Sequence, residues 1–356
     1  MNNIALFGYG TVGKGVRELI DRNPLFHLIS VFDRKEKEKE LGSLLITSID
    51  EIINDKEVDT VVECLGGDSL SYEVIKKALK NGKNVVTSNK ETVSIHLKEY
   101  LSLAEEYRVS FEFEASVGGG IPLIYPLSIQ KDFDEIYEIK GILNGTSNFI
   151  LSKMQDEGMN KEDAILLAQK KGFAEKDPTA DLEGLDMVRK GNILASIVSK
   201  KEIDNIDIPH FGISNINQQI IKEILRLGKT IKLVTDIKFQ NDGLSIVICP
   251  FAISPENPLS TIKNEYNGVM IDGEYQEPLT FIGKGAGKNP TASAILQDLI
   301  RIEKKIPYPY QKITEKIKVK PDLKGTYLLF KADTLKAVNN PTFKQLKDAD
   351  FICKME

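Results

Sequence analysis

The stretch Ile4-Ala-Leu-Phe-Gly-Tyr-Gly-Thr-Val-Gly13 opens the chain with a short apolar run and passes into a glycine-rich turn. A helical pattern follows at once, with apolar residues at Val16, Leu19 and Ile20. Strand, G-x-G-x-x-G and helix in this order form the context that a dinucleotide-binding fingerprint requires. The sequence therefore predicts an α/β fold with a Rossmann-type doubly wound parallel sheet.

Each glycine of the turn has its own expected task. Gly8 permits the tight turn, Gly10 lets the backbone approach a pyrophosphate, and Gly13 lets the helix pack closely on the strand. The pyrophosphate is expected at the helix N-terminus, where Thr11 and Val12 lie. A glycine-rich turn without a ligand is the alternative interpretation.

The second predicted strand, Leu28 to Phe32, ends at an acidic residue followed by two basic residues. Asp33 could accept hydrogen bonds from the adenosine ribose, which would favour NAD. Arg34 and Lys35 could instead hold the 2′-phosphate of NADP. The sequence leaves the choice between the two dinucleotides open.

Helical and strand patterns then alternate, as βαβ units require. The predicted helices lie near 49–53, 72–79 and 97–107, and the predicted strands at 60–63, 84–87 and 109–113. Ligands bind at the carboxyl ends of strands in such sheets. Lys90 follows the strand at 84–87, so its amine is expected near the cofactor crevice, with an ordinary surface lysine as the alternative. Cys64 follows the strand at 60–63 and is predicted to be a plain buried thiol, because no histidine lies near it in sequence.

Two further segments combine polar residues with glycine. Glu114 precedes a bend at Gly118 to Gly120 whose carbonyls could join the carboxylate in a cation site, unless the segment is only a tight turn. Asn144-Gly-Thr-Ser-Asn148 leads into a predicted helix from Phe149 to Met154. Thr146, Ser147 or Asn148 is the predicted cap of that helix.

An acid-rich loop holds the residues Glu175, Asp177, Pro178, Asp181 and Glu183. It passes into a predicted helix that begins near Leu185. Asp186 and Lys190 are four residues apart on this helix, so their side chains share one face. An ordinary surface ion pair is the alternative interpretation of this spacing.

Together these segments resemble the homoserine dehydrogenase family. The resemblance rests on GYGTVG at 8–13, TSNK at 87–90, EASVGGGIP at 114–122, NGTSNFIL at 144–151, GFAEKDPTADLEGLD with RK at 172–190, and GKGAGKNPTASA at 283–294. It covers residues 1 to about 305 in the family's order. The resemblance implies reversible oxidation of L-homoserine to L-aspartate 4-semialdehyde with NAD or NADP, in threonine and methionine biosynthesis.

The resemblance also implies roles for single residues. Glu175 would bind the substrate ammonium, and Asp186 would hold the substrate or orient the working amine. Lys190 would be the general acid/base, with Lys90 as a second candidate, and Asp181 would support the set. A monovalent cation, Na⁺ or K⁺, would lie at Glu114 and the carbonyls of Val117, Gly119 and Ile121, in a structural role. Gly287 precedes a predicted helix at 291–302 and is expected to contact the cofactor.

The chain is expected to divide into two domains and a C-terminal tail. Residues 1–113 with 281–306 form the Rossmann domain, and 114–280 form an α+β substrate-binding and dimerisation domain with strands near 231–236 and 244–251. The helix at 291–302 is expected to pack back on the Rossmann sheet. Residues 307–356 form a tail after a proline-broken linker, 306–310. The tail has one strand-like run, 325–331, with a short helix after it, and is too short for a complete regulatory ACT module. No kinase-like segment precedes Met1, so a monofunctional enzyme is expected.

Composition narrows the class of protein. The 356 residues are 41% hydrophobic and 28% charged with a net charge of -5, which offers no basic patch for nucleic acid and no polybasic membrane anchor. No apolar run approaches the length of a membrane span. Three cysteines without C-x-x-C spacing indicate reduced thiols and a cytoplasmic protein. A small-molecule partner is expected, and the family implies a homodimer.

Three other functions compete with this interpretation. An aspartate-semialdehyde dehydrogenase needs a nucleophilic cysteine with a histidine partner, and no such pairing is evident in the sequence. A non-catalytic dinucleotide sensor would be free to lose Glu175, Asp186 and Lys190, yet all three are present. A dehydrogenase of another amino alcohol or aldehyde stays open, because Glu175 could recognise any ammonium group.

Overall fold

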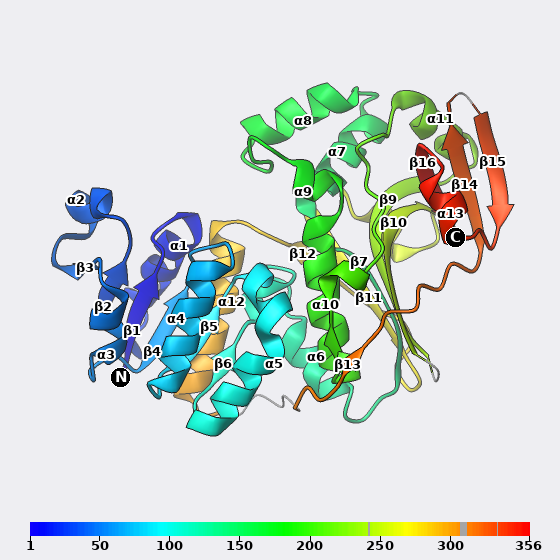
Figure 1. Cartoon of the computed structure of the whole chain (residues 1–356). Helices are drawn as coiled ribbons and strands as arrows, with labels where there is room; N and C mark the ends of the chain where they lie inside the picture. The colour runs from blue at the N-terminus through cyan, green and yellow to red at the C-terminus, as the bar shows by residue number, and fades with distance from the viewer. Residues whose placement is uncertain (241–242, 307–311, 333) are drawn as a thin grey trace. The chain divides into compact units, whose positions relative to one another are not determined.

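The computed structural model of the chain describes residues 1–240, 243–306, 312–332 and 334–356 (Figure 1). The chain forms two compact units. Unit 1 comprises Met1–Asp132, Ser196–Glu202 and Ala286–Glu315, and unit 2 comprises Phe133–Ala195, Ile203–Gly285 and Lys316–Glu356. Each unit joins segments that are distant in sequence. Residues 307–310 of the predicted linker lie outside the described residues.

In the described part of unit 1, six strands form one parallel sheet in the order β3-β2-β1-β4-β5-β6. The strands are β1 (Asn2–Phe7), β2 (Phe26–Phe32), β3 (Leu45–Ile46), β4 (Thr60–Glu63), β5 (Asn84–Thr87) and β6 (Phe111–Glu112). Strand order changes direction between β1 and β4, which is the switch point where such sheets bind their ligands. The predicted Rossmann-type sheet is confirmed.

Helices connect these strands. They are α1 (Thr11–Ile20), α2 (Glu38–Leu41), α3 (Ile49–Asn54), α4 (Ser69–Lys80), α5 (Lys90–Tyr107), α6 (Ile124–Gln130) and α12 (Lys288–Glu303), with a 3-10 turn η3 at Glu114–Ser116. Helix α5 begins at Lys90, well before the predicted Leu97. The side chain of Asn89 accepts hydrogen bonds from the amides of Glu91 and Thr92, so the helix is capped at this point.

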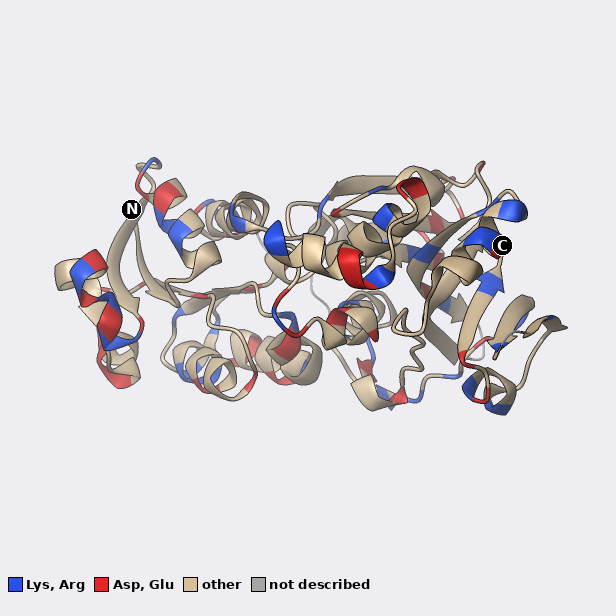
Figure 2. Ribbon diagram, turned by 90° about the horizontal axis from the view of Figure 1, so that it is seen from above, with Lys and Arg blue, Asp and Glu red and all other residues tan. Residues whose placement is uncertain are grey.

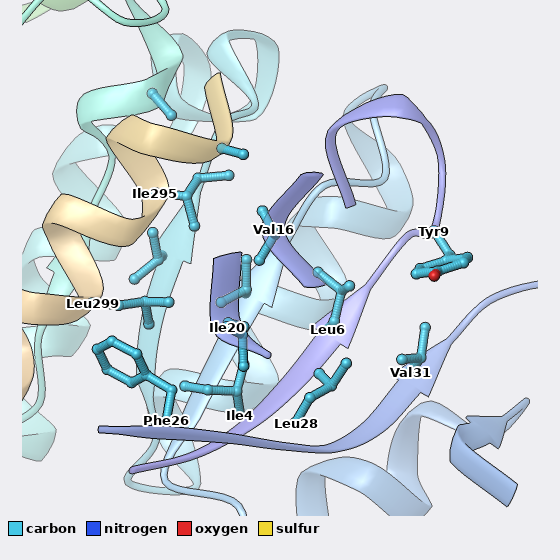
Figure 3. Packing of buried hydrophobic residues seen from close by; sticks show 14 of the residues in the cluster. Ile4, Leu6, Tyr9, Val16, Ile20, Phe26, Leu28, Val31, Ile295 and Leu299 are labelled. Atoms are coloured by element: carbon cyan, nitrogen blue, oxygen red, sulfur yellow. The ribbon is translucent and has the colours of Figure 1, made fainter. Parts of the chain in front are cut away.

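Helix α12 completes the core of unit 1. Ile295 and Leu299 share one buried cluster with residues of β1, β2 and α1, among them Val16 and Ile20 (Figure 3). Gly15 permits close contact, because a Cβ there would lie 2.9 Å from Cγ of Lys288 and 3.0 Å from Cβ of Ala292. The apolar spacing of α12 thus packs it against α1, as its pattern predicted.

Unit 2 is built on an eight-stranded sheet in the order β12-β11-β7-β9-β10-β16-β14-β15, counted over the described residues. The strands are β7 (Ile136–Ile142), β9 (Thr230–Gln240), β10 (Gly243–Ile253), β11 (Tyr266–Gly273), β12 (Leu279–Lys284), β14 (Thr326–Lys331), β15 (Thr334–Asn339) and β16 (Phe351–Met355). Its helices are α7 (Gly145–Asp156), α8 (Lys161–Lys170), α9 (Thr179–Leu182), α11 (Gln218–Arg226), α13 (Phe343–Lys347) and α10 (Leu185–Ser199), whose last residues from Ser196 onward belong to unit 1. Two short strands, β8 (Glu202–Ile203) and β13 (Lys316–Ile317), pair separately.

The C-terminal tail contains more strands than its sequence predicted. The prediction of one strand-like run, 325–331, missed β15 and β16. Strand β16 pairs with both β10 and β14, and Tyr327 and Ile352 join a buried cluster with Cys249 and Phe251. Five residues of β16 are too few for a clear pattern, and β15 is almost wholly exposed. Both strands form because the sheet of unit 2 offers them an edge.

Charged residues of both signs occur on elements of each unit (Figure 2), in line with the net charge of -5. None of the helices among the described residues combines the length and the apolar character needed to cross a bilayer.

A lysine lies in the core of unit 2. Lys232 of β9 is 1% exposed. Its ammonium donates hydrogen bonds to Oδ1 of Asn148, at 3.1 Å, and to the carbonyl of Ile262. Burial lowers the pKa of Lys232 to about 8, although the charge of Asp156 opposes this shift.

This pKa predicts how stability depends on pH. Between about pH 8 and 10 the folded chain releases the Lys232 proton while the unfolded chain, with a lysine pKa near ~10.4, retains it. The free energy of unfolding should therefore rise with pH in this window, by about 1–3 kcal/mol more in the wild type than in Lys232→Met. Chemical denaturation at pH 7, 8, 9 and 10 measures this difference. The exposed Lys222 provides the control, Lys222→Met, and equal slopes for wild type and Lys232→Met would contradict the prediction.

Candidate active site

The glycine-rich turn between β1 and α1 has the geometry of an open anion-binding loop. Gly8 has φ +95, and a Cβ there would lie 2.7 Å from the carbonyl oxygen of Cys64. A Cβ at Gly13 would lie 2.0 Å from the carbonyl oxygen of Gly8, whereas one at Gly10 would meet no atom within 4 Å. Gly10 and Thr11 are exposed, Val12 is partly buried, and no side chain caps the start of α1. The first amides of α1 are therefore available to an anion.

The acidic residue at the end of β2 is tied to this turn. Oδ2 of Asp33 accepts a hydrogen bond from the amide of Tyr9 at 2.6 Å, and Oδ1 accepts one from the amide of Arg34 at 2.7 Å. Each carboxylate oxygen thus already accepts a hydrogen bond from a backbone amide. Arg34 and Lys35 are exposed.

The remaining predicted cofactor residues begin helices of unit 1. Lys90 is the first residue of α5 and is partly buried. Gly287 is the N-cap of α12, with φ +109, and is exposed. Helix α12 has neither a side-chain cap nor an acidic residue in its first turn, so its start presents a positive dipole end. In α5 the side chain of Asn89 already accepts from the amides of Glu91 and Thr92.

The segment predicted to bind a cation is buried. Oε1 of Glu114 accepts hydrogen bonds from the amides of Leu123, at 2.6 Å, and Ile124, at 2.8 Å, and Oε2 accepts one from Tyr125 at 2.8 Å. The carboxylate therefore caps α6, and most of its acceptor capacity is used. A cation here would depend on backbone carbonyls. Val117, Gly119 and Ile121, whose carbonyls were predicted to serve, lie in the buried loop that follows η3.

Unit 2 contains a buried ion pair on α10. Nζ of Lys190 lies 2.7 Å from Oδ2 of Asp186 and donates to the carbonyl of Leu143 at 2.6 Å. The two side chains are only 9% and 8% exposed. This burial excludes the alternative interpretation of the spacing, an ordinary surface ion pair. The third hydrogen of the ammonium has no partner among the described residues.

Asn144 joins this pair to a second carboxylate, and the sequence did not single it out. Its Nδ2 donates to Oδ1 of Asp181 at 2.7 Å and to Oδ2 of Asp186 at 3.0 Å. Its Oδ1 accepts the amide of Ser147 at 2.8 Å, which fixes which end of the amide faces the carboxylates. Asn144 is thus the cap of α7, and the predicted caps Thr146, Ser147 and Asn148 were wrong. The N-cap preference of asparagine was the available signal.

The acid-rich loop divides between this cluster and the surface. Asp181 lies on α9, and burial, together with the charge of Asp186, raises its pKa. Glu175 is exposed, and its carbonyl accepts a hydrogen bond from the side chain of Gln169 at 3.0 Å. The structure brings Asp181, Asp186 and Lys190 together and leaves Glu175 outside their hydrogen bonds.

The cysteines are unsuited to nucleophilic chemistry. Burial, with the charge of Glu63, raises the pKa of the Cys64 thiol, and burial raises the pKa of Cys249 to about 12. A thiol with so high a pKa carries almost no thiolate at neutral pH. A covalent thioester route through either residue is therefore disfavoured.

Profiles of a known protein family match both the N-terminal part of the chain and the part that follows it. A family profile described as homoserine dehydrogenase matches residues 122–300, and one described as its NAD binding domain matches residues 8–114. The chain is 37% identical over 314 residues to the homoserine dehydrogenase of Bacillus subtilis, an alignment that covers 85% of this chain and 72% of that relative.

Solved structures of homoserine dehydrogenases are also similar to this chain. A homoserine dehydrogenase from Thiobacillus denitrificans matches with a TM-score of 0.85 and 30% identity, over 93% of this chain and 83% of that one. A hyperthermophilic archaeal homoserine dehydrogenase in complex with NADPH matches with a TM-score of 0.74 and 27% identity, over 86% of this chain and 99% of that one. This chain belongs to the homoserine dehydrogenase family.

Proposed function

We propose that the chain catalyses the reversible oxidation of L-homoserine to L-aspartate 4-semialdehyde with NAD or NADP. The observation that carries the proposal is the buried amine of Lys190. It is held by Asp186 and the carbonyl of Leu143, and its third hydrogen, which meets no acceptor in the described part of the chain, is left for a ligand. An amine fixed in this way can exchange a proton with a substrate oxygen.

The proposed chemistry assigns each residue of the cluster a task. In its neutral form Lys190 takes the proton of the substrate hydroxyl, and in the reverse direction its ammonium returns a proton to the carbonyl oxygen. Asp186 stabilises the ammonium, and Asn144 holds Asp186 and Asp181 in place. Glu175 binds the substrate ammonium. Lys90 is a second candidate for contact with the reacting oxygen.

The dinucleotide, when bound, supplies the carrier that accepts and donates the hydride. Gly8, Gly10 and Gly13 with the amides of Thr11 and Val12 would hold its pyrophosphate, and Gly287 would lie at a second helix terminus. Asp33 accepts one amide on each carboxylate oxygen, and the exposed Arg34 and Lys35 beside it offer the positive charge that a 2′-phosphate needs. We therefore propose a preference for NADP over NAD.

Three accompanying features are also proposed. A monovalent cation would have a structural role at the carbonyls of Val117, Gly119 and Ile121, next to Glu114. The family resemblance supports a homodimer, which sedimentation of the purified chain would test. The three free cysteines, Cys64, Cys249 and Cys353, support a cytoplasmic location.

The test is the reduction of NADP⁺ and of NAD⁺ by the purified chain with L-homoserine, followed at 340 nm, and the reverse reaction with L-aspartate 4-semialdehyde. We expect turnover with both substrates and a lower KM for NADP⁺. A chain that binds dinucleotide but turns over neither substrate would refute the function. A lower KM for NAD⁺ would refute the assignment of Arg34. Other amino alcohols, assayed in parallel, test the main competing activity.

A further inference from the structure

A buried carboxylate that the proposed chemistry does not use ends β4. Glu63 is 0% exposed. The strand register places it beside Phe7 of β1 and Thr87 of β5. It therefore lies at the switch point of the sheet, at the carboxyl end of the strands where Rossmann folds bind dinucleotides.

Three donors converge on this carboxylate. Oε1 of Glu63 accepts hydrogen bonds from the amide of Leu65 and the hydroxyl of Ser71, both at 2.8 Å. Oε2 accepts one from the hydroxyl of Thr87 at 2.5 Å. Among the described residues no lysine or arginine forms an ion pair with it. Its negative charge is thus stabilised by hydrogen bonds alone.

The two hydroxyls extend the network to the next loop. The amide of Asn89 donates to Oγ1 of Thr87 at 3.0 Å, and Nδ2 of Asn89 donates to Oγ of Ser71 at 2.9 Å and to the carbonyl of Gly67 at 2.6 Å. Since both hydroxyl oxygens accept from Asn89, both hydroxyl hydrogens point to Glu63. Only a hydrogen-bond acceptor at position 63 can receive both of these hydroxyl hydrogens. Asn89 in turn caps α5, which begins at Lys90.

The same network reaches the glycine-rich turn. The amide of Cys64 donates to the carbonyl of Phe7 at 2.8 Å, and Gly8 lies against the carbonyl of Cys64. Gly66 and Gly67 have φ +91 and +75, and a Cβ at either would meet no atom within 4 Å. The loop that Glu63 holds therefore presents open backbone beside the predicted pyrophosphate site.

We propose that Glu63 is a positioning residue of the dinucleotide site. It fixes the loop at 64–67 and the start of α5 in one arrangement against the glycine-rich turn, and so sets the backbone that the dinucleotide contacts. This inference rests on the dinucleotide-binding part of the proposed function and does not depend on the identity of the substrate.

The experiment measures NADPH affinity directly and without substrate, from the fluorescence of the cofactor, because the chain contains no Trp. Thr87→Val removes one hydroxyl at nearly constant shape, and Glu63→Gln removes the charge. We expect each to weaken NADPH binding at least about 10-fold. Thr87→Ser restores the hydroxyl and should bind within about 3-fold of wild type. The double variant should lose no more NADPH affinity than the weaker-binding single variant loses, because both changes break the same hydrogen-bond network.

Thr60→Val is the matched control. Thr60 is a buried threonine at the opposite end of β4, and its hydroxyl has no partner among the described residues. This variant should bind NADPH as the wild type does. Wild-type affinity in Thr87→Val, or equal losses in Thr87→Val and Thr87→Ser, would overturn the inference. If Glu63→Gln fails to fold, the NADPH affinities of Thr87→Val and Thr87→Ser still test whether the hydrogen bond to Glu63 matters for binding. A wild type that binds NADPH but does not oxidise homoserine would refute the proposed substrate and leave this test intact.

Discussion

Replacement of Lys190 by alanine is expected to lower kcat for L-homoserine oxidation by at least about 100-fold. The substitution removes the amine that is proposed to exchange the substrate proton. The affinity for NADPH should change little, because the glycine-rich turn lies in a separate segment of the chain. Steady-state kinetics in both directions, with NADPH titration, measures the two quantities.

The alanine variant also removes the ammonium that lies 2.7 Å from Oδ2 of the buried Asp186, which can cost about 3–5 kcal/mol of stability. Lys190→Arg separates chemistry from folding, because it keeps a positive charge beside Asp186 but cannot release its proton at neutral pH. It should fold and remain at least about 100-fold impaired. Lys153 of α7 pairs with Glu157, the C-cap of that helix, and gives the matched control Lys153→Ala, with activity near wild type. An active Lys190→Arg variant would show that Lys190 is not the acid/base.

Substitution of Asn144 by aspartate is expected to lower kcat/KM by about 100-fold or more. The new carboxylate would keep one oxygen on the amide of Ser147, so the cap of α7 survives. Its other oxygen would face Asp181 and Asp186, where the amide nitrogen now donates at 2.7 and 3.0 Å. Three carboxylates would then compete for one ammonium, and the added negative charge should move the acidic limb of the pH–rate profile upward.

Asn144→Ser separates the added charge from the lost hydrogen bonds. The serine keeps a capping oxygen and adds no charge. Its kcat/KM should therefore fall only about 10-fold, and its pH–rate profile should match that of the wild type. Asn217 caps α11 in the same way, and Asn217→Asp should be nearly neutral. A pH profile of Asn144→Asp identical to that of the wild type would mean that Asn144 does not control the charge of this cluster.

Local geometry explains which predictions succeeded. The order of strand, glycine turn and helix is fixed within about ten residues, and the steric demands at Gly8 and Gly13 follow from backbone conformation alone. Asp186 and Lys190 meet because residues four apart on a helix share a face. That the pair is buried did not follow from spacing, because burial depends on the strands and loops that cover α10.

The contacts that the sequence did not reveal join residues far apart in the chain. Asn144 is 37 residues from Asp181 and 42 from Asp186, and Glu63 is 24 residues from Thr87. The tail strands β15 and β16 form only because unit 2 provides a sheet edge. The sequence by itself determined the glycine-rich turn, the doubly wound sheet and the spacing of Asp186 and Lys190, since these depend on local backbone conformation and periodicity. The tertiary structure alone decided that Asn144 links two carboxylates, that Glu63 anchors two loops and that Glu175 stays exposed, because each depends on which distant segments pack together.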